Sequence, residues 1–165
     1  MTPASRLAMD STVAEATYVA MPTEYIPKFT ATLATHHSFQ LRQAMHCSQE
    51  MAEAITLRQI QELHQHEQAS AHQYLVAVQW QNAIIGGAWY SAPPQQVAIL
   101  QWLMIEEDFQ GQGHGKNLLA HVVGQCRCAG SAGLALHVFT ANHKSIHLYE
   151  SMGFSDVGKE MYLKW

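Results

Sequence analysis

A closely spaced set of glycines constrains this chain more than any other feature. The stretch "EEDFQGQGHGKNLLAHVV" (residues 106–123) joins the apolar, strand-like run "VAILQWLMI" to a segment with helical character, and it carries Gly111, Gly113 and Gly115. A glycine turn at the start of a helix presents free backbone N–H groups, and the helix dipole favours an anion there. We therefore expect this turn to hold a phosphate group, with Lys116 beside it.

Two familiar phosphate-binding motifs do not fit the turn. In a P-loop alignment, Gln110 stands at the first glycine position and Asn117 replaces the Ser or Thr that would hold magnesium. In a dinucleotide fingerprint, Lys116 takes the place of the third glycine. A glycine turn that holds no ligand is the alternative that the spacing leaves open.

The whole chain predicts one α/β domain over residues 1–165, in which residues 1–14 form a loose tail. Strands are expected over residues 15–21, 73–80, 83–91, 97–105, 134–139 and 160–165. Helices are expected from residue 26 onward, over residues 41–65 as one long helix or two short ones, and over residues 116–126 and 141–154. Short connections between the three middle strands favour an antiparallel meander in a mixed sheet.

Composition excludes several classes of protein. Apolar residues make up 48 % of the chain, which is typical of a globular protein, and the net charge of −4 argues against a nucleic-acid partner. No run approaches the roughly 20 apolar residues of a membrane span, and no signal peptide is recognisable. Three cysteines without a C-x-x-C pair indicate a reducing compartment. We therefore expect a cytoplasmic protein with no membrane partner.

The eleven histidines raise the question of a metal site. His66 and Glu67 begin an H-E-x-x-H pattern, but Ser70 stands where the second histidine would be. We therefore expect no metal.

Two motifs together resemble one known family. The first is [QR]-x-x-G-x-[GA], preceded here by a strand that ends in "LMI", and the second is an asparagine followed by "LYE" and a Gly-Phe pair. On these motifs the chain is similar to the GNAT superfamily of N-acetyltransferases, most clearly over residues 97–165. The residues that carry the resemblance are Gln110, Gly111, Gln112, Gly113, His114 and Gly115, then Asn142, Tyr149, Gly153 and Phe154.

The resemblance implies a fold and a set of roles. A central sheet, mixed but mostly antiparallel and flanked by helices, would hold acyl-CoA in a V-shaped splay between two strands. The backbone of residues 111–116 would bind the CoA pyrophosphate, and main-chain groups of Met104 and Ile105 would meet the pantetheine arm and the thioester carbonyl. Asn142 would hydrogen-bond the pantetheine, with Ser145 on the same helix face. Tyr149 would protonate the departing thiolate.

The resemblance leaves the general base open. Many members of the family carry a glutamate on the strand before the glycine turn, where this chain has Trp102. Glu106, just after the strand, is the tentative base, and Glu107, His137 or an ordered water are the alternatives. Aromatic residues of the middle strands are candidates for an acceptor pocket, although strand alternation places Trp89 and Tyr90 on opposite faces.

These residues predict an N-acetyltransferase that uses acetyl-CoA. A primary amine, on a small molecule or a peptide, would attack the thioester directly in a ternary complex, and a homodimer is compatible with the resemblance. One alternative is an acyl-CoA-binding sensor or scaffold with weak catalysis, which the missing strand carboxylate keeps open. A second is an enzyme that binds a nucleotide phosphate at the same turn. The sequence does not name the acceptor amine.

Overall fold

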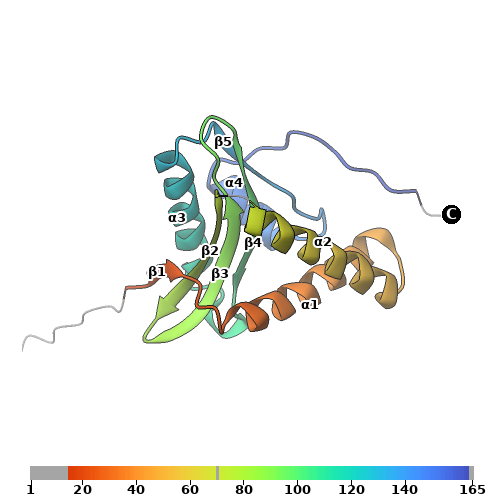
Figure 1. Cartoon of the computed structure of the whole chain (residues 1–165). Coiled ribbons are helices and arrows are strands. Elements are labelled where there is room, and N and C mark those ends of the chain that lie inside the picture. The colour runs from red at the N-terminus through yellow and green to blue at the C-terminus, as the bar shows by residue number, and fades with distance from the viewer. Residues whose placement is uncertain (1–14, 70, 164–165) are drawn as a thin grey trace, which may run out of the picture.

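A five-stranded sheet forms the centre of the protein. The computed structural model describes residues 15–69 and 71–163, so the expected loose tail over residues 1–14 lies outside the described part of the chain. The sheet order is β1-β2-β3-β4-β5, in which the first four strands are antiparallel and β5 joins β4 in parallel (Figure 1). The strands are β1 (Thr17–Ala20), β2 (Gln73–Trp80), β3 (Ala83–Ser91), β4 (Val97–Ile105) and β5 (Gly133–Leu136). This arrangement confirms the expected α/β fold with a mixed, mostly antiparallel sheet.

The antiparallel meander follows from its turn chemistry. Gln81 and Asn82 join β2 to β3 with positive φ angles of 48° and 65°. A two-residue turn with both central residues in this region matches the right-handed twist of the flanking strands. The bounds of β2, β3 and β4 are those predicted from the sequence.

Two long helices, α1 (Ile26–Met45) and α2 (Gln49–Ala69), cover one face of the sheet. The segment predicted as one long helix or two short ones over residues 41–65 belongs to two helices, because residues 41–45 end α1 and α2 begins at Gln49. His46 adopts a left-handed conformation (φ 50°) after α1, and the Ser48 hydroxyl accepts a hydrogen bond of 3.2 Å from the Met51 N–H in the first turn of α2. This contact is that of a helix N-cap, which the sequence analysis did not predict.

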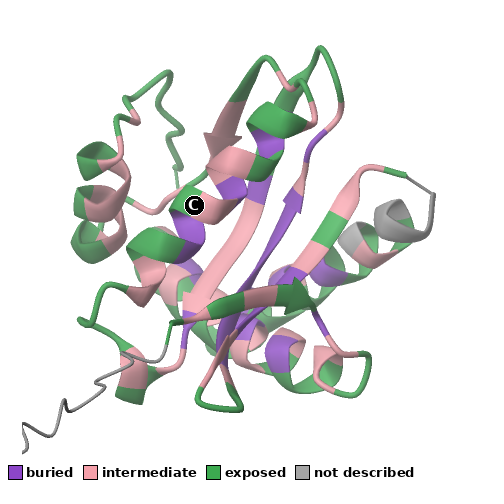
Figure 2. Cartoon of the chain, turned by 90° about the vertical axis from the view of Figure 1, so that its left-hand side faces the viewer, coloured by how far each residue is buried: buried purple, intermediate pink, exposed green. Residues whose placement is uncertain are grey.

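The opposite face carries a short 3-10 helix, η1 (Glu107–Phe109), and the helices α3 (His114–Cys128) and α4 (His143–Ser151). Strand alternation divides β4 between the two faces. Leu103 and Ile105 belong to the hydrophobic cluster shared with α3 and α4, whereas Trp102 and Met104 pack on the cluster shared with α1. Buried residues concentrate on the middle strands and on the helix faces that meet them (Figure 2).

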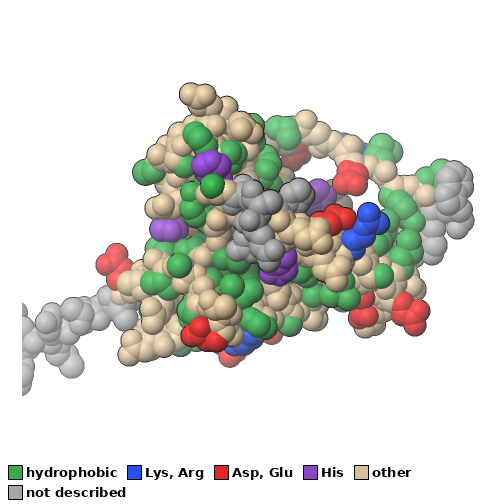
Figure 3. Space-filling model, viewed as in Figure 1, with side chains coloured by type: hydrophobic (Ala, Val, Ile, Leu, Met, Phe, Trp, Pro, Cys, Tyr) green, Lys and Arg blue, Asp and Glu red, His purple; other side chains and the backbone are tan. Residues whose placement is uncertain are grey.

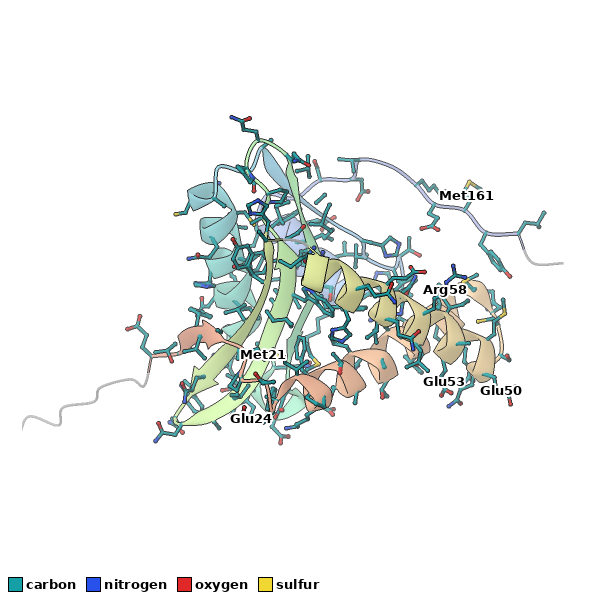
Figure 4. The ribbon with its side chains drawn as sticks, viewed as in Figure 1. Met21, Glu24, Glu50, Glu53, Arg58 and Met161 are labelled. Carbon is teal, nitrogen blue, oxygen red and sulfur yellow. The ribbon has the colours of Figure 1, made fainter. Side chains whose placement is uncertain are left out.

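The C-terminal segment differs from its prediction. Residues 160–163 form no strand, and residues 164–165 lie outside the described residues. Met161 is 83 % exposed on an extended segment that leads away from the sheet (Figure 4). A strand needs a hydrogen-bonded neighbour. The strand β5 pairs with β4, and residues 160–163 do not pair with either of them. The strand predicted over residues 134–139 also ends early, at Leu136.

No helix in the described ranges is long and apolar enough to cross a membrane. On the face that Figure 3 shows, acidic and basic side chains are scattered among uncharged ones.

Candidate active site

A cavity opens where β4 and β5 stop pairing. Residues 97–100 of β4 pair with residues 133–136, and β4 then continues to Ile105 without a β5 partner. The cavity has a volume of about 690 Å³ and is lined by this end of β4, the segment after β5, the glycine turn, α4 and parts of α1 and α2. The strand splay that the resemblance implied is therefore present.

The backbone of β4 is bent and closely supported at this point. Trp89 pairs with Trp102 and Tyr90 pairs with Leu100, which leaves Gln101 as the extra residue of a β-bulge. Behind the splay, a Cβ added to Gly86 would collide with the carbonyl oxygen of Met104 and lie 2.9 Å from the Ile105 Cα. Gly86 is a positioning residue that sequence analysis missed, and the signal was the "GG" pair inside a strand.

The glycine turn exposes its backbone as predicted for an anion site. Gly111 (φ 74°) and Gly113 (φ 88°) adopt left-handed conformations, and a Cβ added at either position would meet nothing within 4 Å. Gly113 is the N-cap of α3, so the first N–H groups of the helix lie next to this open space. Gly115 packs more closely, because a Cβ added there would lie 3.8 Å from both the Ile105 and the Leu148 side chains.

Two residues of the glycine motif support the turn and do not line the cavity. The His114 ring lies 5.7 Å from the Trp80 ring, which also contacts Phe109. The Gln112 side chain donates a hydrogen bond of 3.1 Å to the Asp108 carbonyl. These contacts fix the turn against η1 and the sheet.

Gln110 links the end of β4 to α4. Its Nε2 donates to the Ile105 carbonyl at 2.8 Å, and its Oε1 accepts from Lys144 Nζ at 2.6 Å. Lys144 and Lys116 both line the cavity beside the glycine turn. Sequence analysis missed Lys144, although its place two residues after Asn142 gave a signal once the second motif was recognised.

The predicted residues of α4 lie together on the cavity wall. Asn142 is the N-cap of α4, and its Oδ1 accepts a hydrogen bond of 3.2 Å from the Ser145 N–H. Tyr149 lines the same cavity, and its ring packs 5.8 Å from that of Phe154. Burial raises the pKa of Tyr149, so its hydroxyl stays protonated at neutral pH and can act as a proton donor.

Glu106 lies apart from this group. Its carboxylate accepts hydrogen bonds from the Tyr25 hydroxyl at 2.6 Å and from Lys28 Nζ at 2.8 Å, and it is not among the residues that line the cavity. Burial raises the pKa of Glu106, but the hydrogen bonds from Lys28 and Tyr25 and the charge of Lys28 outweigh burial and hold it below its ordinary value. A carboxylate stabilised in this way is a weak base.

The aromatic residues divide as strand alternation predicts. Trp89 is fully buried and lies 5.7 Å from Trp102, which lines the cavity. Tyr90 packs on the opposite face near Cys126, where burial raises its pKa to about 12. Of the three, Trp102 is therefore the one that can meet an acceptor.

His37 of α1 is a further residue of the cavity wall that sequence analysis missed. Its Nδ1 lies 3.0 Å from the Thr56 hydroxyl, and its ring lies 6.0 Å from the Trp102 ring and 5.5 Å from the Phe139 ring. No motif marks it, because its contacts with Thr56, Trp102 and Phe139 form only when separate elements pack together. His137, an alternative base in the sequence analysis, also lines the cavity and lies 3.5 Å from Glu160.

Comparisons with known proteins identify the family of the chain. The sequence model of the acetyltransferase (GNAT) family matches residues 37–154. The uncharacterized N-acetyltransferase YycN of Bacillus subtilis (strain 168) is 34 % identical over 84 residues, which is 49 % of this chain and 54 % of that protein. The ribosomal protein bS18-alanine N-acetyltransferase of Escherichia coli (strain K12) is 39 % identical over 54 residues, or 33 % of this chain and 36 % of that protein. These sequence alignments thus span about half of the first relative and less of the second.

Solved structures extend the likeness to nearly the whole chain. The crystal structure of YycN from Bacillus subtilis matches with a TM-score of 0.81 and 25 % identity, covering 92 % of this chain and 99 % of that one. The aminoglycoside N-acetyltransferase AAC(6')-Iy bound to CoA matches with a TM-score of 0.57 and 15 % identity, covering 92 % and 95 %, which is a likeness of fold alone. The family match, the strand splay and the paired motifs agree, and the chain belongs to the acetyltransferase (GNAT) family.

Proposed function

We propose that this protein transfers the acetyl group of acetyl-CoA to a primary amine by direct attack within a ternary complex. One observation carries the proposal. Residues from both motifs, among them Met104, Gly113, Asn142 and Tyr149, line a single cavity, although they are far apart in the sequence. The same cavity extends to α1 and α2, which leaves room for a second substrate beside the first.

The cavity suits CoA at the end where the glycine turn lies. Left-handed Gly111 and Gly113 leave open space above the backbone, and an anionic pyrophosphate can approach the N–H groups there. Lys116 and Lys144 add positive charge at the same end. The unpaired edge of β4 offers main-chain groups along which an amide-containing pantetheine arm can form hydrogen bonds.

Acetyl-CoA supplies the acetyl group as a thioester, and the residues around it would orient and polarise that group. A main-chain N–H of residues 104–105 would stabilise negative charge on the carbonyl oxygen. Tyr149, whose raised pKa keeps it protonated, would donate a proton to the departing sulfur. Asn142 would hold the pantetheine with its side-chain amide while its oxygen caps α4.

The presence of a general base would distinguish an acetyltransferase from a protein that only binds acyl-CoA. Glu106, the base predicted from the sequence, remains a proposal, but its two hydrogen-bond donors and lowered pKa do not favour it. An acyl-CoA sensor with little catalysis is the rival function, since β4 carries no carboxylate.

Thiol release from acetyl-CoA in the presence of a panel of amines tests the proposal. We expect thiol release that depends on the amine, and mass spectrometry should detect the acetylated amine. Double-reciprocal plots of the initial rates should give intersecting lines, as a ternary complex requires. Binding of acetyl-CoA without transfer to any amine would favour the sensor. No binding of acetyl-CoA by the folded protein would contradict both readings.

A further inference from the structure

We propose that His37 accepts the proton from the acceptor ammonium, and that the contact with the Thr56 hydroxyl holds its ring in position. The inference rests on the proposed acetyl transfer and names a base for it on the helix side of the cavity. Its location differs from that of the motif residues, because His37 belongs to α1 and Thr56 belongs to α2.

The placement of the ring is the first support. His37 lines the same cavity as Met104, Ile105 and Tyr149, so it shares one space with the groups proposed to hold the thioester. Trp102 and Phe139 lie against its ring at centroid distances of 6.0 Å and 5.5 Å. Packing on these two rings limits the motion of the imidazole and shields it from bulk water.

The behaviour of Thr56 is the second support. Threonines within helices commonly bond back to the carbonyl four residues earlier, and Thr30, Thr32 and Thr35 of α1 do so. Thr56 is fully buried, and its hydroxyl contacts His37 Nδ1 at 3.0 Å. The hydroxyl either accepts from Nδ1–H or donates to Nδ1, depending on the tautomer of the ring. In the tautomer in which Nδ1–H donates, Nε2 is the ring nitrogen that accepts a proton.

The charges around the ring are consistent with a neutral imidazole. Burial and the nearby His137 both lower the pKa of His37 below its ordinary value of 6.5. His36 of α1 and the uncharged Gln59 of α2 line the same cavity, and the uncharged Thr56 contacts the ring. From the C-terminal segment, Glu160 pairs with His137 at 3.5 Å. At neutral pH His37 is therefore deprotonated and able to accept a proton.

The proton balance of the transfer is complete with this residue. An aliphatic ammonium loses one proton to His37 Nε2, which later passes it to solvent. The amine lone pair then forms the N–C bond to the acetyl carbon, and the C–S bond breaks. The sulfur takes a proton from Tyr149, and the second proton of the acceptor nitrogen replaces it on the tyrosine.

The test compares His37→Gln with wild type across pH, once wild-type transfer to an amine is established. We expect kcat/KM of wild type to fall as pH is lowered through the His37 pKa, below 6.5. His37→Gln should lose about 10²-fold or more at neutral pH and lose that acidic limb. The acceptor in this test is an aliphatic monoamine, whose pKa of about 10 lies well above this limb.

A second pair of variants separates proton transfer from folding. Thr56→Val should lower kcat and shift the acidic limb, whereas Thr56→Ser keeps the hydroxyl and should restore both. His121→Gln is the matched control, because His121 is also partly buried with a lowered pKa but stacks on Tyr18 outside the cavity. It should leave the rate and the limb unchanged.

The outcomes distinguish this inference from the proposed function. An acidic limb that persists in His37→Gln, whether or not the rate falls, would overturn the role in proton transfer. Equal rates for Thr56→Val and Thr56→Ser would overturn the positioning role. Wild-type protein that acetylates no amine would instead remove the proposed function on which the inference rests.

The charge of the cavity wall carries a second inference, independent of His37. Among the described residues that line the cavity, the charged side chains other than histidines are Lys116 and Lys144, both beside the glycine turn, and no carboxylate lines it. The acidic residues of α2 that Figure 4 labels, Glu50 and Glu53, lie at the end of that helix away from the sheet. Glu160, the partner of His137, is an 85 % exposed side chain.

A polycationic acceptor needs carboxylates to offset its additional charges. We infer that the acceptor is an amine whose body is uncharged and apolar or aromatic next to the reacting nitrogen, such as a monoamine or a peptide N-terminus. Trp102 and Phe139 supply the matching surface.

Competition between matched amines tests this class. Phenethylamine or a neutral peptide with a free N-terminus should give a kcat/KM at least about tenfold above that of spermidine at equal concentration of free amine. A spermidine value equal to or above theirs would overturn the inference while leaving the proposed acetyl transfer intact. Transfer to none of the three, with thiol release from another amine class, would overturn it as well.

Discussion

The two ends of the cavity are built in different ways. At the glycine turn, the groups proposed to meet CoA are backbone N–H groups and one face of α4, set by Gly111, Gly113 and Asn142. At the helix end, the wall consists of side chains such as His37 and Trp102 on separate elements. The glycine end can be recognised in the sequence as a motif, because recognition by the backbone requires glycine at fixed spacing. The second leaves no local pattern, because its contacts join distant segments.

The largest effect should follow from placing a side chain at the glycine end. Gly113→Val puts a β-branched residue at φ 88° and fills the open space above the turn. We expect the affinity for CoA to fall at least about 100-fold, measured by isothermal titration calorimetry. Gly124→Ala is the control, since its added Cβ meets nothing within 4 Å and α3 favours alanine. CoA binding by the valine variant at wild-type strength would refute the pyrophosphate site.

The second largest effect should come from Tyr149, where a substitution separates the binding of CoA from the chemical step. Tyr149→Phe keeps the ring that packs on Phe154 and removes only the hydroxyl. Turnover should fall about 10²-fold while the dissociation constant of CoA stays the same, because the lost proton acts after binding. Steady-state rates and direct binding measure the two quantities. An unchanged kcat would remove Tyr149 from the role of proton donor.

A smaller effect should appear in the strand that joins the two ends. Gly86→Ala would push the added methyl group into the backbone of Met104 and Ile105. We expect a loss of about 1–3 kcal/mol in the free energy of unfolding, as for other overpacked sites, measured by urea denaturation. Gly133→Ala, on β5 with open space around it, should cost less. Equal stability for the two variants would mean that β4 is not held closely at this point.

The smallest effect should come from Glu106, outside the cavity. If His37 is the base, Glu106→Gln changes kcat by less than about threefold, and a loss of 10²-fold or more would restore the sequence-based assignment.

Because the pKa of Glu106 is lowered on folding, its ion pair with Lys28 stabilises the protein at neutral pH. That contribution is lost as pH falls through the folded-state pKa. Unfolding of wild type and variant should therefore differ most near pH 7 and converge in acid.

Sequence reasoning succeeded where local chemistry decides the structure. The strands of the meander alternate and end in turn residues, and the glycine turn carries a motif, so both were predictable. It did not locate the break between α1 and α2, where Ser48 caps the second helix. It also failed at the last strand, because a strand needs a partner that the pattern of one segment does not show. Lys144 and His37 were missed because their roles depend on tertiary contacts with Gln110 and Thr56.

A structure of the protein with CoA tests the central claim most directly. We predict that the pyrophosphate lies against the backbone N–H groups of residues 111–116 and that the pantetheine arm follows β4 between the splayed strands toward Tyr149. The thiol should then point into the part of the cavity that His37 lines. CoA bound elsewhere, or a pyrophosphate away from the glycine turn, would contradict the account.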